Sequence, residues 1–167
     1  VNCLCNDGRE RRGKIIMVHE GKYWDGLVFT TFTFQEFFVD DNQIIGEKTV
    51  SQSINADGFR ESVIDISGSI ILADGSGTIT YEADKIRTIV EGSDTPTKRD
   101  DVTETTGGST CVLADGTEKT MNIITALVRT NEEECYRYIV EGIREITATD
   151  APTITIDYGD GTCDNLA

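Results

Sequence analysis

Residues 157–165, "DYGDGTCDN", are the densest group of potential metal ligands in the chain. Calcium binds six to eight oxygen atoms, and Asp157, Asp160 and Asp164 could supply several of them. The EF-hand pattern, which needs alternating ligands and a Glu at its twelfth position, is missing. Aspartate next to glycine is also typical of tight turns. We therefore predict that these carboxylates shape the backbone, and they remain weak calcium candidates in a chain that needs no metal or cofactor.

Five cysteines could bind zinc or form disulfides: Cys3, Cys5, Cys111, Cys135 and Cys163. Zinc is not predicted, because one residue separates Cys3 from Cys5 where zinc knuckles have two to four, and the chain has one histidine. We expect an exported, oxidised protein with one or two disulfides and one leftover thiol. The pairing of Cys3, Cys5 and Cys111 stays open.

The remaining two cysteines are predicted to pair. A hairpin of 135–147 and 152–158 that turns about Thr149 would place Cys135 opposite Cys163, with Cα atoms about 4.5–5.5 Å apart. The bond would close a loop and stabilise the fold by on the order of 3 kcal/mol. The predicted disulfide is therefore Cys135–Cys163.

Residues for catalysis or ligand contact are sparse. His19, at the end of a strand-like run, is interpreted as a strand-edge residue, and no nucleophile, zinc-protease or phosphate-loop motif occurs. Tyr23 and Trp24 lie in an expected turn and could stack on a sugar, although a Trp that covers the edge of the core is the alternative. We predict that the protein is not an enzyme.

Length and charge limit the partners. A chain of 167 residues fits a single domain, here 1–167. Thirty acids against fifteen bases give a net charge of −15, which repels nucleic acid and anionic lipid surfaces. No apolar run reaches the length of a membrane-spanning helix.

The elements that would position these residues are strands. Asp-Gly occurs six times and predicts type I′ hairpin turns between antiparallel strands. No sustained helical period is present, so we expect fewer than about a tenth of the residues in helix. Strands are predicted at 14–19, 27–39, 43–54, 59–67, 69–73, 78–91, 102–113, 118–130, 135–147 and 152–158. The predicted fold is an all-β antiparallel meander of about 8–10 strands, forming a sandwich or a barrel-like roll.

Strand 27–39 contains most of the phenylalanines. Simple alternation would place Phe32, Phe34 and Phe38 on one face and Phe29 and Phe37 on the other. A large cavity lined by these rings would favour ligand binding, and a packed core would favour an assembly role.

Four blocks of the chain resemble, in the same order, a family of uncharacterised exported proteins of Bacteroidota, many of them hypothetical lipoproteins: "NCLCNDGRERRGKII", "FVDDNQIIGEKTV", "SDTPTKRDDV" and "TITIDYGDGTCDN". The resemblance implies a secreted, β-rich protein at the cell surface, as an outer-membrane lipoprotein, or in the periplasm. Any membrane association would be indirect, through a lipid anchor outside this chain. The family has no established activity, so no catalytic residue is implied.

Relatives in that family typically have a further strand at each end. A chain that lacks these strands would expose a sheet edge, which invites pairing with a protein partner or a neighbouring copy. We therefore expect a non-enzymatic protein that supports assembly or adhesion through protein–protein interaction. The alternative is a β module that binds a glycan or a lipid.

Overall fold

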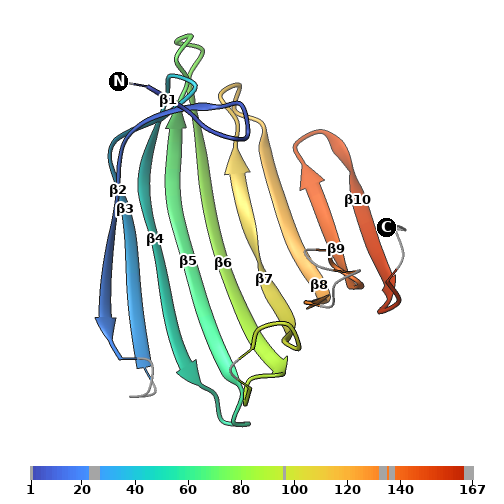
Figure 1. The fold of residues 1–167 in the computed structure, drawn as a ribbon. Coiled ribbons are helices and arrows are strands. Elements are labelled where there is room, and N and C mark those ends of the chain that lie inside the picture. Colours follow the sequence, from blue (N-terminus) through green and yellow to red (C-terminus); the bar gives the residue numbers. More distant parts are fainter. Residues whose placement is uncertain (1, 23–26, 96, 132–134, 136–137, 164–167) are drawn as a thin grey trace.

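The computed structural model describes residues 2–22, 27–95, 97–131, 135 and 138–163. These residues form one antiparallel sheet whose strands follow chain order (Figure 1). The strands are β1 (Cys3–Leu4), β2 (Glu10–Gly21), β3 (Leu27–Val39), β4 (Asn42–Ile54), β5 (Arg60–Ile71), β6 (Thr78–Glu91), β7 (Val102–Val112), β8 (Glu118–Thr130), β9 (Glu141–Ala148) and β10 (Ala151–Asp160). No helix within the described ranges is long and apolar enough to cross a membrane.

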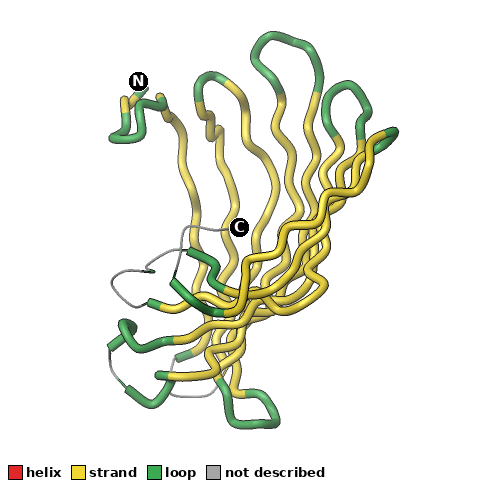
Figure 2. The backbone as a smooth tube through the Cα atoms, turned by 90° about the vertical axis from the view of Figure 1, so that its right-hand side faces the viewer, coloured by secondary structure: helices red, strands yellow, loops and turns green. Residues whose placement is uncertain are grey.

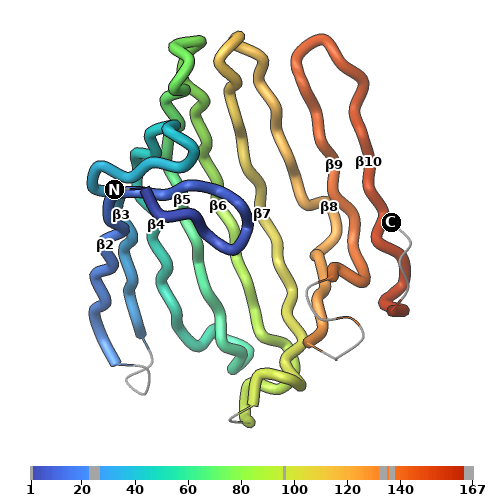
Figure 3. The backbone as a smooth tube through the Cα atoms, turned by 45° about the horizontal axis from the view of Figure 1, so that its top comes forward, coloured from blue at the N-terminus to red at the C-terminus, as the bar shows by residue number. Residues whose placement is uncertain are grey.

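The predicted all-β meander is confirmed, with ten strands and no helix in the described part of the chain. Figures 1 and 3 show β2 and β10 at opposite sides of the sheet, and Figure 2 shows that the strands bend into a curved surface. The sheet does not close into a barrel, because β2 pairs with β1 and β3 while β10 pairs with β9. The molecule is therefore an open roll with two free edges.

The predicted type I′ geometry of the Asp-Gly turns is wrong for the four that connect described strands. At Asp115–Gly116, the amide of Gly116 donates to the carbonyl of Leu113, and the amide of Leu113 donates to the carbonyl of Thr117 (both 2.9 Å). Gly116 has φ +86°, whereas Asp115 is not among the residues with positive φ. This is a type I turn followed by a bulge at a left-handed glycine. The same pattern occurs at Cys5–Arg9 and Asn55–Phe59, and with a slightly longer loop at Leu72–Gly77.

Two consecutive positive φ values, which a type I′ turn requires, occur instead at Asp40 (49°) and Asp41 (65°) between β3 and β4. A short polar side chain tolerates this conformation better than other non-glycine residues do. The predicted strands 27–39 and 43–54 placed a connection here, but its type I′ geometry was not predicted, because it contains no glycine.

Some predicted strand bounds also change. Residues 59–67 and 69–73 belong mainly to one continuous strand, β5. The strand predicted at 135–147 begins at Glu141, so Cys135 lies in the connection before β9 and not on a strand opposite Cys163. The pair still meets, as described below, but through a different arrangement.

A bulge in β3 overturns the simple alternation of its phenylalanines. The register shifts between Thr33 and Phe37, and Glu36 has φ +45°. After this shift Phe37 lies on the same face as Phe34, and their rings stack with centroids 5.5 Å apart. Phe38 moves to the opposite face, beside Arg12. An inserted residue reverses the side-chain order because successive strand residues point to opposite faces.

The described residues form a single sheet, and no second layer of these residues covers either face. The core is therefore small. The buried apolar residues in this part are Val28, Ala83, Leu127, Cys135 and Val140. Many larger apolar side chains remain exposed, including Met17 and Ile154 on the edge strands. This architecture leaves both faces and both edges accessible.

Candidate functional site

Residues that pair directly across neighbouring strands carry their side chains on the same face of a sheet. One row of such pairs crosses nine strands, from β2 to β10: Met17, Phe32, Lys48, Ile66, Ala83, Ser109, Met121, Ile146 and Ile154. The paired rows on this side contain eight basic side chains and no Asp or Glu. We call it the cationic face, and its bases are Arg11, Lys48, Arg60, Lys85, Arg87, Lys119, Arg129 and Arg144.

The paired rows on the other side carry the acids. These include Glu20, Glu47, Glu61, Asp65, Glu82, Asp84, Glu104, Glu118 and Glu145. The bases in these rows are Arg12 and Lys14, both on β2. Although the net charge of the chain is −15, the sheet therefore has one basic and one acidic face.

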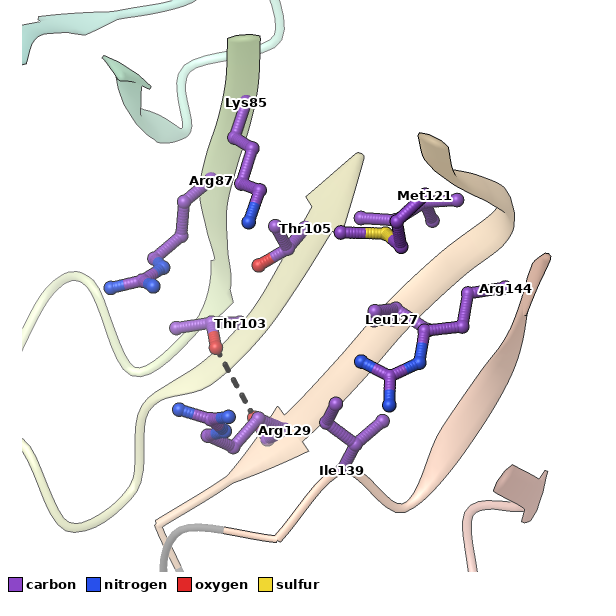
Figure 4. A pocket seen from close by; sticks show the side chains of 10 residues that line it. Lys85, Arg87, Thr103, Thr105, Met121, Leu127, Arg129, Ile139 and Arg144 are labelled. Atoms are coloured by element: carbon purple, nitrogen blue, oxygen red, sulfur yellow. Dashed lines mark hydrogen bonds between the residues drawn. The ribbon is translucent and has the colours of Figure 1, made fainter. Parts of the chain in front are cut away.

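The cationic face is hollowed between β6 and β9. The hollow has a volume of about 230 Å³ and is lined by Lys85, Arg87, Thr103, Thr105, Met121, Ile123, Leu127, Arg129, Ile139 and Arg144. Figure 4 shows basic side chains from β6, β8 and β9 around the apolar side chains of Leu127 and Ile139. The lining thus combines positive charge with an apolar surface.

The four bases of the hollow have no anionic partner among the described residues. They are Lys85, Arg87, Arg129 and Arg144. The Nε atoms of Arg129 and Arg144 are buried and have no hydrogen-bond acceptor in this part of the chain. Unpaired buried donors cost free energy, and gathered like charges repel one another. Both effects favour an anion at this position.

Two interactions orient the walls of the hollow. The guanidinium of Arg144 lies over the ring of Tyr158, 5.3 Å from its centroid, so β10 holds this side chain on the cationic face. The hydroxyl of Thr103 donates to the carbonyl of Arg129 at 3.5 Å (Figure 4). These contacts tie the wall residues to neighbouring strands.

The predicted Cys135–Cys163 disulfide is present, with Cα atoms 5.6 Å apart. It joins the connection before β9 to the residues after β10. The same two segments are joined by a hydrogen bond from the amide of Gly161 to the carbonyl of Val140 (3.0 Å). Ile139, which lines the hollow, stands between Cys135 and β9, so the disulfide fixes one wall of the hollow.

The calcium candidates make turn-type hydrogen bonds where the structure describes them. Oδ1 of Asp157 accepts from the amide of Gly159 (3.0 Å), and Oδ1 of Asp160 accepts from the amide of Thr162 (3.3 Å). Asp164 lies outside the described residues. No group of three or more potential ligands is found in the part of the chain that the structure describes.

The other predicted residues contribute little to the hollow. Tyr23 and Trp24 lie outside the described residues. Nδ1 of His19 lies 2.9 Å from the hydroxyl of Thr30 on the adjacent strand. The five phenylalanines of β3 do not line the hollow, because it lies between β6 and β9 and β3 is distant from these strands in the sheet.

The remaining cysteines are unpaired in the structure. Cys3, Cys5 and Cys111 are free, so the chain has one disulfide and three thiols where one leftover thiol was expected. Cys111 lies on β7, whereas Cys3 lies on β1 at the far side of the sheet.

The bases of the hollow were not predicted from the sequence. The sequence contains part of the signal for a basic face. In β6, Lys85 and Arg87 are at odd positions, whereas Glu82 and Asp84 are at even positions, so bases and acids point to opposite faces of the strand. Their association with Arg129 depends on the register of β7 and β8, which the sequence does not display.

Comparison with known proteins gave no relative: no family model, curated protein or solved structure matches this chain.

Proposed function

We propose that this protein is a non-enzymatic assembly module of the cell surface or periplasm, in which β2 of one copy pairs with β2 of a second copy. The observation that carries this proposal is the unpaired, apolar and self-complementary edge of β2. Edges of this kind are templates for pairing with another chain.

The edge of β2 is open over most of its length. Pairing with β1 involves Glu10 and Arg11 alone. Beyond them, Ile15, Ile16, Met17 and Val18 are between 42% and 62% exposed. A run of four exposed apolar residues on an edge strand is a recognised association surface, because both the backbone groups and the side chains gain from pairing.

The residues of β2 match a second copy in antiparallel register. If Met17 faces Met17 of the other copy, Lys14 lies opposite Glu20 and Ile16 lies opposite Val18. Lys14 and Glu20 are exposed and belong to the same face, because they are separated by an even number of positions without an intervening bulge. The register therefore forms two equivalent ion pairs across a two-fold axis.

Export is supported by the disulfide, since such bonds persist in oxidising compartments. Placement at the cell surface or in the periplasm, and indirect association with the outer membrane, remain part of the proposal and derive from the family resemblance of the sequence.

Charge reversal tests the register. We expect the wild-type protein to dimerise in sedimentation velocity experiments at low salt. Lys14→Glu or Glu20→Lys alone should weaken dimerisation by about tenfold or more, because each places like charges opposite one another twice. The double variant Lys14→Glu/Glu20→Lys should restore the dimer.

Glu47→Lys is the matched control, because it makes the same charge change as Glu20→Lys on the same face but on β4. It should leave the dimer intact. A wild-type protein that stays monomeric at about 100 μM would refute the pairing, since the dissociation constants of specific complexes lie well below this concentration. Failure of the double variant to recover dimerisation would refute the register.

A further inference from the structure

We propose that the hollow on the cationic face binds an anionic amphiphile, a molecule with a carboxylate or phosphate head and a short apolar chain. The inference rests on the lining of the hollow and does not require dimerisation through β2. The inference names the chemical class of the ligand. The net charge of −15 by itself would not suggest that any surface of this protein binds an anion.

The head is defined by the arginines. Guanidinium groups donate parallel hydrogen bonds that match the oxygen atoms of carboxylates and phosphates. Arg129 and Arg144 each have a buried Nε without an acceptor among the described residues. Lys85 and Arg87 add positive charge from β6, and Figure 4 shows these side chains around the same space as Arg129 and Arg144. An anionic head would supply the missing acceptors.

The apolar chain is defined by the rest of the lining. Met121, Ile123, Leu127 and Ile139 contribute hydrocarbon surface to the hollow. Burying further apolar area against them stabilises a complex. Because about 230 Å³ lies below the usual range for drug-sized ligands, the ligand should be small or should leave the end of its chain in solvent.

The partial burial of the basic side chains favours a small anionic amphiphile over a long polyanion. Lys85, Arg129 and Arg144 are half-buried, and only Arg87 of the four is exposed. Lys48, another base of this face, lies apart from them on β4, beside the ring of Phe32 (5.7 Å from its centroid). A polyanion would instead be favoured by a line of exposed bases.

Isothermal titration calorimetry with decanoate and decyl phosphate, kept below their micellar concentrations, tests the proposal. Binding of either probe supports it, and the stronger of the two identifies the head. Decanol, which lacks the charge, and acetate and inorganic phosphate, which lack the chain, should bind at least about tenfold more weakly.

Arg144→Met and Arg129→Met should each weaken binding of the charged probe by about ten- to a hundredfold, as expected for the loss of a charge-assisted hydrogen bond. Lys48→Met makes the same charge change on the same face, outside the hollow, and should change affinity by less than about threefold. Because either arginine variant could disturb β9 or β8, circular dichroism checks the fold. The exposed Arg87→Met provides a third variant, whose affinity should also fall.

Several results would overturn the proposal: no binding of either charged probe, equal binding of decanol, equal binding of acetate or phosphate, or an equal loss in Lys48→Met. Tight binding of a sulfated polysaccharide that Lys48→Met weakens as much as Arg144→Met would indicate a polyanion surface instead. Repeating the titration with Lys14→Glu separates this site from dimerisation, because this variant should dimerise more weakly and yet bind the probe equally well.

Discussion

At the scale of single residues, the turns are stabilised by aspartates that accept hydrogen bonds from residues two positions later. Oδ1 of Asp74 accepts from the amide (2.9 Å) and hydroxyl (2.7 Å) of Ser76. Hydrogen bonds from Ser76 lower the pKa of Asp74, and hydrogen bonds from Thr117 lower the pKa of Asp115. The guanidinium of Arg11 holds the pKa of Asp7 well below its usual range. These carboxylates stabilise the folded state in their ionised form.

The lowered pKa values predict loss of stability in acid. A carboxyl whose pKa is lower in the folded than in the unfolded state stabilises the fold above the unfolded pKa of about 3.9, and this contribution disappears as the pH falls through the folded pKa. We expect the urea midpoint to decrease between about pH 4.5 and pH 2.5. Asp74→Asn/Asp115→Asn keeps the oxygen acceptors without titrating there, so its decrease should be smaller than that of the wild type.

Glu47→Gln/Glu82→Gln also removes two carboxylates and serves as the control for net charge. If the acid dependence of both double variants equals that of the wild type, the turn aspartates do not contribute to it.

The second prediction at this scale concerns the contribution of the disulfide to stability. Cys135 and Cys163 are 28 residues apart, and in the chain-entropy model a loop of this length stabilises the fold by about 3–4 kcal/mol. Cys135→Ala/Cys163→Ala should therefore lower the free energy of unfolding by about that amount in urea titrations. Cys3→Ala, which removes an exposed free thiol, should have little effect. Non-reducing peptide mapping that finds Cys163 as a free thiol would contradict the assignment.

At the scale of elements, bulges decide how the strands fit. Gly13 and Gly107 stand where two strands approach closely, and a Cβ at Gly107 would collide with the carbonyl oxygen of Asp84. Gly107 also has φ +103°, a value that other residues rarely adopt. The neighbouring register shift in β7 lies between Thr105 and Gly108. Such a glycine is needed both for its conformation and for its missing side chain.

Gly107→Ala should lower the free energy of unfolding by about 1–3 kcal/mol, because it adds backbone strain and a steric clash. Gly68→Ala, in the interior of β5, is the control. Its φ lies outside the left-handed region, and the added Cβ would be 3.1 Å from the carbonyl oxygen of Ile45. Urea unfolding should show a smaller loss for this variant. Equal losses would mean that the conformation of Gly107 is not the cause.

At the scale of the whole molecule, the open sheet separates three surfaces. The acidic face remains available to solvent, the cationic face carries the hollow, and β2 offers an edge. Pairing through β2 would extend the sheet while leaving the hollow, between β6 and β9, uncovered. The charge-reversal and titration experiments therefore address independent parts of the protein.

The proposed dimer also requires that the melting temperature rise with protein concentration, which single-residue effects do not produce.

Much of the fold could be predicted because its interactions are local. In a meander each strand pairs with its neighbour in the chain, so Asp-Gly turns and alternating strands predict the strand order directly. The Cys135–Cys163 disulfide was predicted for a related reason, since both cysteines flank the β9–β10 hairpin. Its predicted basis, direct opposition on two strands, was wrong, because Cys135 precedes β9.

The sequence by itself determined an all-β meander, the positions of most turns and one disulfide, because these depend on residue conformation and on neighbours in the chain. Only the tertiary structure decided which residues share a face. A bulge near Glu36 shifts the register of β3 and reverses the side-chain order in the rest of that strand. For that reason Phe37 joined Phe34. The pairing of β6 to β9 brought Lys85 and Arg87 together with arginines from two other strands at one hollow.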